Sequence, residues 1–270
     1  MIESLQGRLI FGRTTRIRSL ELGPYAGTYR TTTRRLRRPD GAVLEGWSTA
    51  PVEGRAEGTL LYFGGRNENV AWVAGMASFN PGWAIHAFNY RGFGASTGRS
   101  SERRARCDAR AIHDAVGAGQ AIANLAIVGR SLGTAIALGL ARETRPARLV
   151  LMSPFESVPD VVRTRLLGRV VARLVTQRFA CAGLAQAHPG KTLVLLAEHD
   201  TSIPHGQSLA LCARLPRPPD VQVVRGTTHQ SLPRSPGAQA EIARFLASDP
   251  CLPAAGPRGP ALPRVTSRRP

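Results

Sequence analysis

Six short apolar segments in the middle of this 270-residue chain constrain its fold more than any other feature of the sequence. Each has a continuous core rich in valine, leucine or isoleucine, which is typical of strands buried on both faces of a parallel sheet. Segments with helical periodicity lie between several of them. The alternation predicts an α/β domain with a mostly parallel sheet. The expected strands are 58–65, 83–92, 124–129, 147–153, 191–197 and 221–226, and the expected helices are 102–119, 132–142, 206–215 and 236–247.

The regions outside this alternation divide the chain further. Asp40 and Gly41 form a turn dipeptide within residues 36–50, which predicts an antiparallel hairpin at one edge of the sheet. The tail is rich in proline and arginine and has no apolar period, so it cannot bury enough surface to order itself. The expected segments are an N-terminal extension over residues 1–24, a domain over 25–248 with a lid at about 156–190, and a disordered tail over 249–270.

The composition narrows the classes of function. The formal net charge is +18, and Lys191 is the only lysine, so nearly all of the positive charge is arginine. Scattered arginine in place of lysine indicates genomic base composition, and we do not expect nucleic acid to be the partner. Neither a spanning apolar stretch nor a signal peptide is visible, which predicts a cytoplasmic location. The four cysteines form no C-x-x-C pair, so we expect no metal site and no disulfide framework.

Ser131 is the candidate nucleophile. It lies in G-R-S-L-G, residues 129–133, between an apolar run and a helix of small residues. Small residues two positions before and after the serine allow a sharp strand-to-helix turn, which presents the hydroxyl above the sheet at a helix N-terminus. A serine hydroxyl is a poor nucleophile and requires a base.

His229 is the candidate base, because it follows the last expected strand and its loop can reach over the sheet. His199, directly after the preceding strand, is the rival. The base needs a carboxylate that fixes its tautomer, and Asp200 at the end of the strand before His229 is our candidate. Glu198, two residues earlier, is the alternative.

The oxyanion of an acyl-transfer intermediate requires backbone donors. The Leu132 N–H is a candidate donor, because an N–H at the start of a helix has no acceptor within the helix. The second donor is expected in the glycine-rich loop that follows T-L-L-Y-F, where we choose the Arg66 N–H and keep Asn67 as the neighbouring candidate.

The chain resembles the α/β-hydrolase fold serine hydrolases, in particular a small lidded branch. N-Y-R-G-F-G-A-S-T-G at 89–98 nearly completes a motif of that branch, and G-R-S-L-G, L-A-E-H-D-T-S-I-P and G-T-T-H match the others. The resemblance covers about residues 40–248, and the order Ser131, Asp200, His229 is the chain order of this fold. Gly64 stands where the branch usually has histidine. We expect the 89–98 loop to be structural, with Arg91 paired to a carboxylate and Glu102 complementing a helix dipole.

The resemblance implies a serine hydrolase that cleaves a small-molecule acyl ester or thioester without a metal or organic cofactor. A serine peptidase or amidase with the same triad stays open, and so does a non-catalytic binding protein on this scaffold. Val162, Leu166, Val170 and Leu174 recur every fourth residue in the expected lid, with arginines between them. They predict a lid helix with its apolar side on the site. Peripheral contact of this basic helix with an anionic membrane is the other hypothesis.

Overall fold

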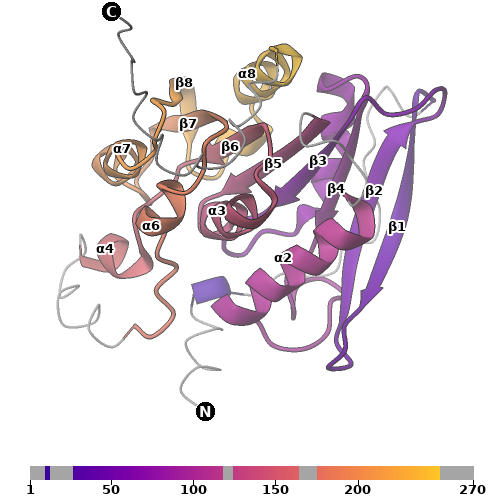
Figure 1. Ribbon diagram of the computed structural model, residues 1–270, viewed down its shortest axis with the longest axis horizontal. Helices are drawn as coiled ribbons and strands as arrows, with labels where there is room; N and C mark the ends of the chain where they lie inside the picture. Colours follow the sequence, from indigo (N-terminus) through magenta and orange to yellow (C-terminus); the bar gives the residue numbers. More distant parts are fainter. Residues whose placement is uncertain (1–9, 13–26, 118–123, 164–174, 250–270) are drawn as a thin grey trace, which may run out of the picture.

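A computed structural model describes residues 10–12, 27–117, 124–163 and 175–249 of the chain. Its strands form one eight-stranded sheet in the order β1-β2-β4-β3-β5-β6-β7-β8 (Figure 1). The strands are β1 (Tyr29–Arg37), β2 (Val43–Pro51), β3 (Gly58–Phe63), β4 (Trp83–Phe88), β5 (Leu125–Arg130), β6 (Arg148–Met152), β7 (Lys191–His199) and β8 (Asp220–Thr228). The helices are η2 (Val70–Phe79), α2 (Glu102–Val116), α3 (Leu132–Thr144), α4 (Val158–Arg163), α6 (Ala182–Ala185), α7 (His205–Cys212), η4 (Leu232–Arg234) and α8 (Pro236–Ala247).

The predicted α/β fold class is confirmed. The six strands from β3 onward pair in parallel, while β1 and β2 form an antiparallel hairpin that joins the sheet through β4. Each of the six predicted strands overlaps an observed one. The 3₁₀ helix η2 was not expected, because it lies between two strands in a segment without helical periodicity.

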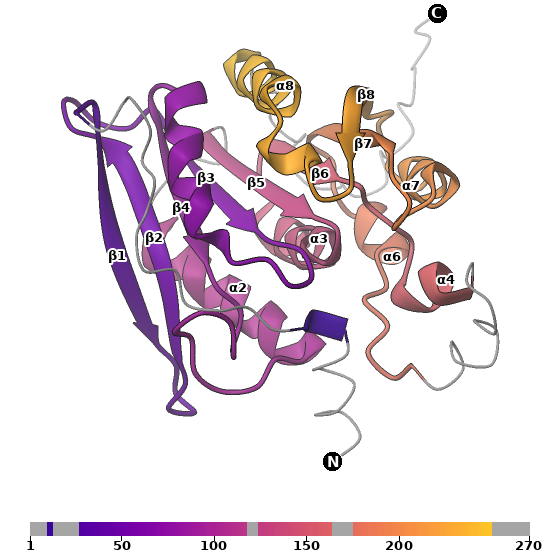
Figure 2. The same ribbon diagram turned by 180° about the vertical axis from the view of Figure 1, so that it is seen from behind.

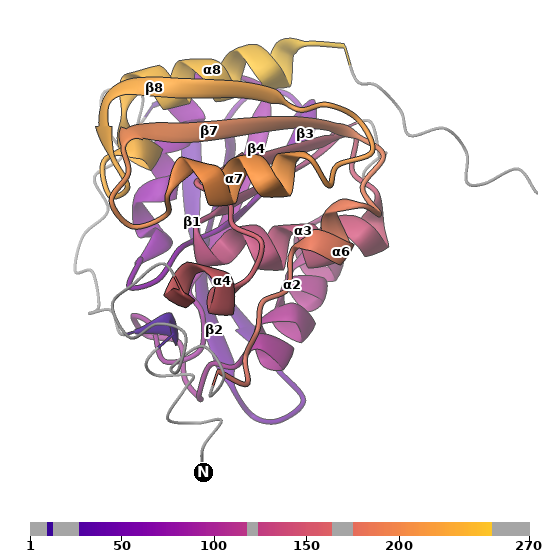
Figure 3. The ribbon, with the colours of Figure 1, turned by 90° about the vertical axis from the view of Figure 1, so that its left-hand side faces the viewer.

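Both faces of the sheet are covered, which explains the continuous apolar strands. Helices α2, α3, α6 and α7 lie on one face, and η2 and α8 on the other (Figures 1, 2 and 3). The side chains of β5 alternate between the two cores: Leu125 and Ile127 face the first group of helices, and Ala126 and Val128 face the second. A strand buried on both faces has no polar alternation, so a run of apolar residues identifies it.

The β1–β2 hairpin turns where the sequence predicted. Gly41 has φ +79°, a conformation in which glycine avoids the strain of a side chain. Strand β1 forms one edge of the sheet, with β8 at the other, and its arginines are exposed along its length. They are Arg30, Arg34, Arg35 and Arg37.

Part of the expected N-terminal extension belongs to the domain. Phe11 is 1% exposed and makes edge-to-face ring contacts with Tyr90, Phe93 and Phe179, at centroid distances of 5.2, 6.5 and 5.6 Å. The boundary expected at residue 25 therefore excludes a residue of the core. Residues 1–9 and 13–24 lie outside the described residues.

The expected lid is described at its two ends only. It contributes α4 and α6, while Leu166, Val170 and the other residues of 164–174 lie outside the described part. The lid helix and its membrane contact therefore stay predictions, as does the disordered tail, of which only Asp249 is described. No helix in the described residues is long and apolar enough to cross a bilayer.

The 89–98 loop forms the ion pair that we expected of it. Arg91 donates from Nε and Nη2 to the Asp108 carboxylate at 2.7 and 2.9 Å, and it also pairs with Asp40. Glu102 is the first residue of α2, and its carboxylate accepts the Phe179 N–H at 2.9 Å. Arg91 therefore ties the loop after β4 to α2.

Candidate active site

Ser131 occupies the sharp turn between β5 and α3. Its backbone has φ +50° and ψ −119°, a conformation that costs a non-glycine residue about 1–3 kcal/mol. The two flanking glycines make the turn possible by allowing close approach. A Cβ on Gly133 would lie 2.0 Å from the Phe63 carbonyl oxygen, and one on Gly129 would lie 2.6 Å from the Gly133 carbonyl oxygen. The motif therefore presents the hydroxyl at the end of the sheet, as the spacing predicted.

The structure brings the three predicted side chains together. His229 Nε2 lies 3.1 Å from Ser131 Oγ, and His229 Nδ1 lies 2.9 and 3.1 Å from the two Asp200 carboxylate oxygens. The His229 side chain is 9% exposed and that of Asp200 1%. The three residues come from the loops after β5, β7 and β8, at the carboxyl ends of parallel strands where ligands of such sheets bind.

The surroundings of Asp200 favour its ionised form. Burial raises the pKa of a carboxyl, but hydrogen bonds from His229 and from the backbone N–H of Ile203 outweigh it and lower the Asp200 pKa to about 2. Ser202 and Ile203 donate their N–H groups to Oδ1 at 2.9 and 2.8 Å. An anionic carboxylate held in this way can orient the imidazole and stabilise its cation.

Neither alternative residue joins this chain of hydrogen bonds. The His199 side chain is 66% exposed and lies 3.5 Å from Glu198. The Glu198 carboxylate accepts the Gly226 N–H at 2.8 Å. Their contacts are instead with each other and with the backbone of β8.

The geometry separates the two candidates for the second oxyanion donor. The Asn67 N–H donates to the Phe11 carbonyl at 2.9 Å, so it is occupied. The loop itself lies over the nucleophile, because a Cβ on Gly65 would be 3.3 Å from Ser131 Cβ. Leu132 is the first residue of α3, a position whose N–H has no acceptor within the helix. Arg66 and Leu132 therefore remain the predicted pair of donors.

The sequence did not predict a buried ion pair that lies beneath the site. Arg130 Nη1 donates to Glu68 at 2.8 Å, and both side chains are 8% exposed. Burial lowers the pKa of an arginine, but the charge and hydrogen bond of Glu68, together with the charges of Tyr62 and Asp200, outweigh it and raise the Arg130 pKa. The position of Arg130 inside the G-R-S-L-G motif was the available signal, but its partner lies 62 residues away.

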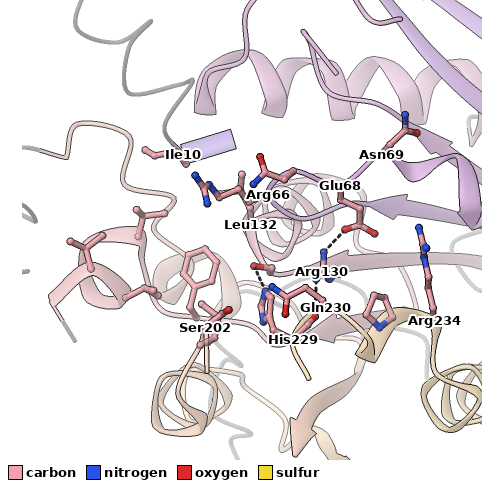
Figure 4. Close-up of a pocket in the computed structure, with 18 of the residues that line it drawn as sticks. Ile10, Arg66, Glu68, Asn69, Arg130, Leu132, Ser202, His229, Gln230 and Arg234 are labelled. Carbon is pink, nitrogen blue, oxygen red and sulfur yellow. Dashed lines mark hydrogen bonds and ion pairs between the residues drawn. The ribbon is translucent and has the colours of Figure 1, made fainter. Parts of the chain in front are cut away.

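A cavity of about 690 Å³ opens beside Ser131 (Figure 4). Its lining combines apolar residues, several of them from α4, with Trp72 and the side chains of Arg66 and Arg234. Arg234 lies over the Trp72 ring, 5.1 Å from its centroid. The apolar residues are Ile10, Leu132, Phe155, Val158, Val161, Val162 and Ile203. Across the described residues, no cluster of three histidine, cysteine or acidic side chains could hold a metal ion.

Comparison with known proteins agrees with this architecture. Residues 54–189 match the profile of the family described as serine aminopeptidase, S33. An uncharacterized protein of Mycobacterium tuberculosis, Rv2307c, is 31% identical over 195 residues, which cover 70% of this chain and 69% of that protein. The lysophosphatidylserine lipase ABHD12 of Gallus gallus is 38% identical over 88 residues, or 31% of this chain and 23% of the lipase. Among solved structures, the acetyl xylan esterase from Paenibacillus sp. R4 superimposes with a TM-score of 0.65 at 18% identity, covering 84% of this chain and 86% of the esterase.

Proposed function

Since the chain belongs to the serine aminopeptidase S33 family and has the α/β-hydrolase fold, we propose that it is a serine hydrolase of acyl esters or thioesters. The observation that carries the proposal is the continuous hydrogen-bonded chain from Ser131 through His229 to Asp200. A serine activated by a base that is itself oriented by a carboxylate is suited to nucleophilic attack on a carbonyl.

The reaction follows from this geometry. Ser131 Oγ attacks the substrate carbonyl carbon while His229 Nε2 accepts its proton, and Asp200 stabilises the imidazolium that forms. The N–H groups of Leu132 and Arg66 stabilise the tetrahedral oxyanion. The leaving alcohol or thiol takes the proton from His229. A water molecule, deprotonated by His229, then attacks the acyl-enzyme and releases the carboxylic acid and the free Ser131 hydroxyl.

The lining of the cavity supports an acyl substrate over a peptide with a free amino terminus. Its apolar residues, among them Phe155 and those of α4, offer the acyl group a place out of water. Recognition of an α-ammonium group calls for an unpaired carboxylate. Among the described residues of the lining, Glu68 is the one carboxylate, and it is paired with Arg130. Arg66 and Arg234 add positive charge, which repels an ammonium group.

Covalent labelling tests the proposal. A fluorophosphonate probe reacts with activated serines, so we expect it to label the purified protein and not the Ser131→Ala variant. Ser78→Ala, which changes a serine outside the cavity lining, is the control and should label like the wild type. Hydrolysis of p-nitrophenyl esters of increasing chain length, beside the matching anilides, then separates esterase from amidase. A folded wild type that takes up no label would contradict the proposal and favour a binding protein on this scaffold.

A further inference from the structure

The Glu68–Arg130 ion pair joins three loops that contribute to the site (Figure 4). Arg130 belongs to the nucleophile turn, directly before Ser131. Its second nitrogen, Nη2, donates to the backbone carbonyl of His229 at 2.7 Å. Glu68 belongs to the loop expected to carry an oxyanion donor, and it accepts the Gly65 N–H at 2.6 Å. One pair of side chains thus contacts the turn of the nucleophile, the loop of the base and the loop of the donor.

The carboxylate of Glu68 is fully used. Besides Arg130 and Gly65, it accepts the Tyr62 hydroxyl at 2.9 Å and the Trp72 indole N–H at 3.0 Å. These four hydrogen bonds occupy the four acceptor positions that a carboxylate offers. A buried charge with every acceptor position filled has one orientation, so Glu68 fixes the guanidinium of Arg130.

We propose that Glu68 and Arg130 are positioning residues for the hydrolytic reaction. They hold His229, and the loop expected to carry the Arg66 oxyanion donor, in place relative to Ser131. This inference rests on the proposed function. The guanidinium is a planar fork, and two of its nitrogens bind two different loops at once. His229 is held from its backbone by Arg130 and from its ring by Asp200, so the distance from Nε2 to Ser131 Oγ is set on both sides. The Glu68 carboxylate accepts the Gly65 N–H, and this hydrogen bond orients the adjacent peptide of Arg66.

Two variants and a matched control test this role through ester hydrolysis. Arg130→Met removes both hydrogen bonds with little change of volume, and Arg130→Lys keeps the cation but loses the fork. We expect both to lower kcat by about 10²-fold, because displacement of about 1 Å has that effect on a reacting group. KM should change by less than about threefold, since the lost contacts are within the protein. Arg91→Met breaks a second buried ion pair, with Asp108, whose two residues are not part of the cavity lining, and should lower stability with kcat unchanged.

The outcomes separate positioning from a structural role. If Arg130→Met keeps kcat within about twofold of the wild type, the proposal is wrong. If Arg91→Met loses kcat equally, the effect is general destabilisation and the proposal also fails. Should Arg130→Met not fold, Arg130→Lys decides, because it retains the charge beside Glu68.

A second measurement does not depend on turnover. The proton on His229 Nδ1, shared with Asp200, gives a downfield proton NMR signal that reports the order of the ring. We expect it to broaden in Arg130→Lys and to stay sharp in Arg91→Met. A sharp signal in Arg130→Lys would overturn the positioning role. A wild type without label or turnover would instead count against the proposed function, and this signal would still test the positioning.

Discussion

At the residue scale, the hydrogen bonds of Asp200 make the stability of the fold depend on pH. Its side chain is 1% exposed, and its hydrogen bonds lower its pKa from 3.8 to about 2. A carboxyl with a lower pKa in the folded state stabilises the fold above its unfolded pKa, and this stabilisation is lost as the pH falls through the folded value. The window for Asp200 therefore runs from about pH 4 down to about pH 2.

Asp200→Asn removes this contribution and makes it measurable. At pH 5 we expect the free energy of unfolding to be lower in the variant than in the wild type, and the difference to shrink by about 2 kcal/mol as the pH falls to about 2. Urea unfolding of both proteins across this range is the measurement. A difference that stays constant with pH would show that the Asp200 carboxyl has no lowered pKa.

Gly133 carries a steric prediction at the same scale. Its added Cβ would meet the Phe63 carbonyl oxygen at 2.0 Å, so Gly133→Ala should destabilise the protein by more than about 3 kcal/mol or prevent folding. Gly183→Ala is the matched helical control, because nothing lies within 4 Å of its added Cβ. It should be neutral or stabilising by up to about 1 kcal/mol. Equal melting temperatures for the two variants would contradict the close approach.

The residues of the site differ in how far the sequence reveals them. Ser131, Asp200 and His229 could be predicted to meet, because each follows a strand of one parallel sheet and such strands end together. The sequence does not reveal the pairing of Glu68 with Arg130, because nothing local marks which loop carboxylate meets which buried arginine. Similarly, the choice between Asn67 and Arg66 depends on a backbone contact with Phe11, in a segment that has no apolar pattern.

At the scale of elements, the short segment around Phe11 closes one end of the domain. The ring fills a space between the loop after β4 and the chain near Phe179, and Ile10 beside it lines the cavity. Segments of this kind escape prediction, since one buried aromatic residue in a weakly patterned stretch has no period. The strands, in contrast, were predicted because burial on both faces requires continuous apolar runs.

Phe11→Ala measures what this segment contributes. We expect the free energy of unfolding to fall by about 3–5 kcal/mol, as for other buried phenylalanines, because the ring leaves a cavity between three aromatic partners. Urea unfolding is again the measurement. Phe79→Ala is the control at a phenylalanine that is 44% exposed, and it should cost far less. If both variants lose the same stability, the packing of Phe11 onto the core is wrong.

At the scale of the whole molecule, the formal charge of +18 opposes the compact state. With 36 basic and 18 acidic residues, repulsion outweighs attraction when the charges are averaged over the molecule. Screening by salt weakens the repulsion more than it weakens the buried ion pairs.

The melting temperature should therefore rise when NaCl increases from about 20 mM to about 300 mM. Circular dichroism melts at the two concentrations provide the measurement. Equal additions of a neutral osmolyte at low salt control for effects that do not depend on charge. A melting temperature that falls with NaCl would mean that attractive ion pairs dominate the electrostatics of the fold.

The arginines of β1 have a consequence for how copies of the chain meet. An outer strand offers unpaired backbone groups to any other strand, and two sheets can join there into a continuous ribbon. Two β1 strands that approached one another would bring Arg30, Arg34, Arg35 and Arg37 of each copy alongside the same four residues of the other. Like charges at that spacing repel. The positive charge that opposes the compact state of the single molecule therefore also opposes self-association along the β1 edge of the sheet.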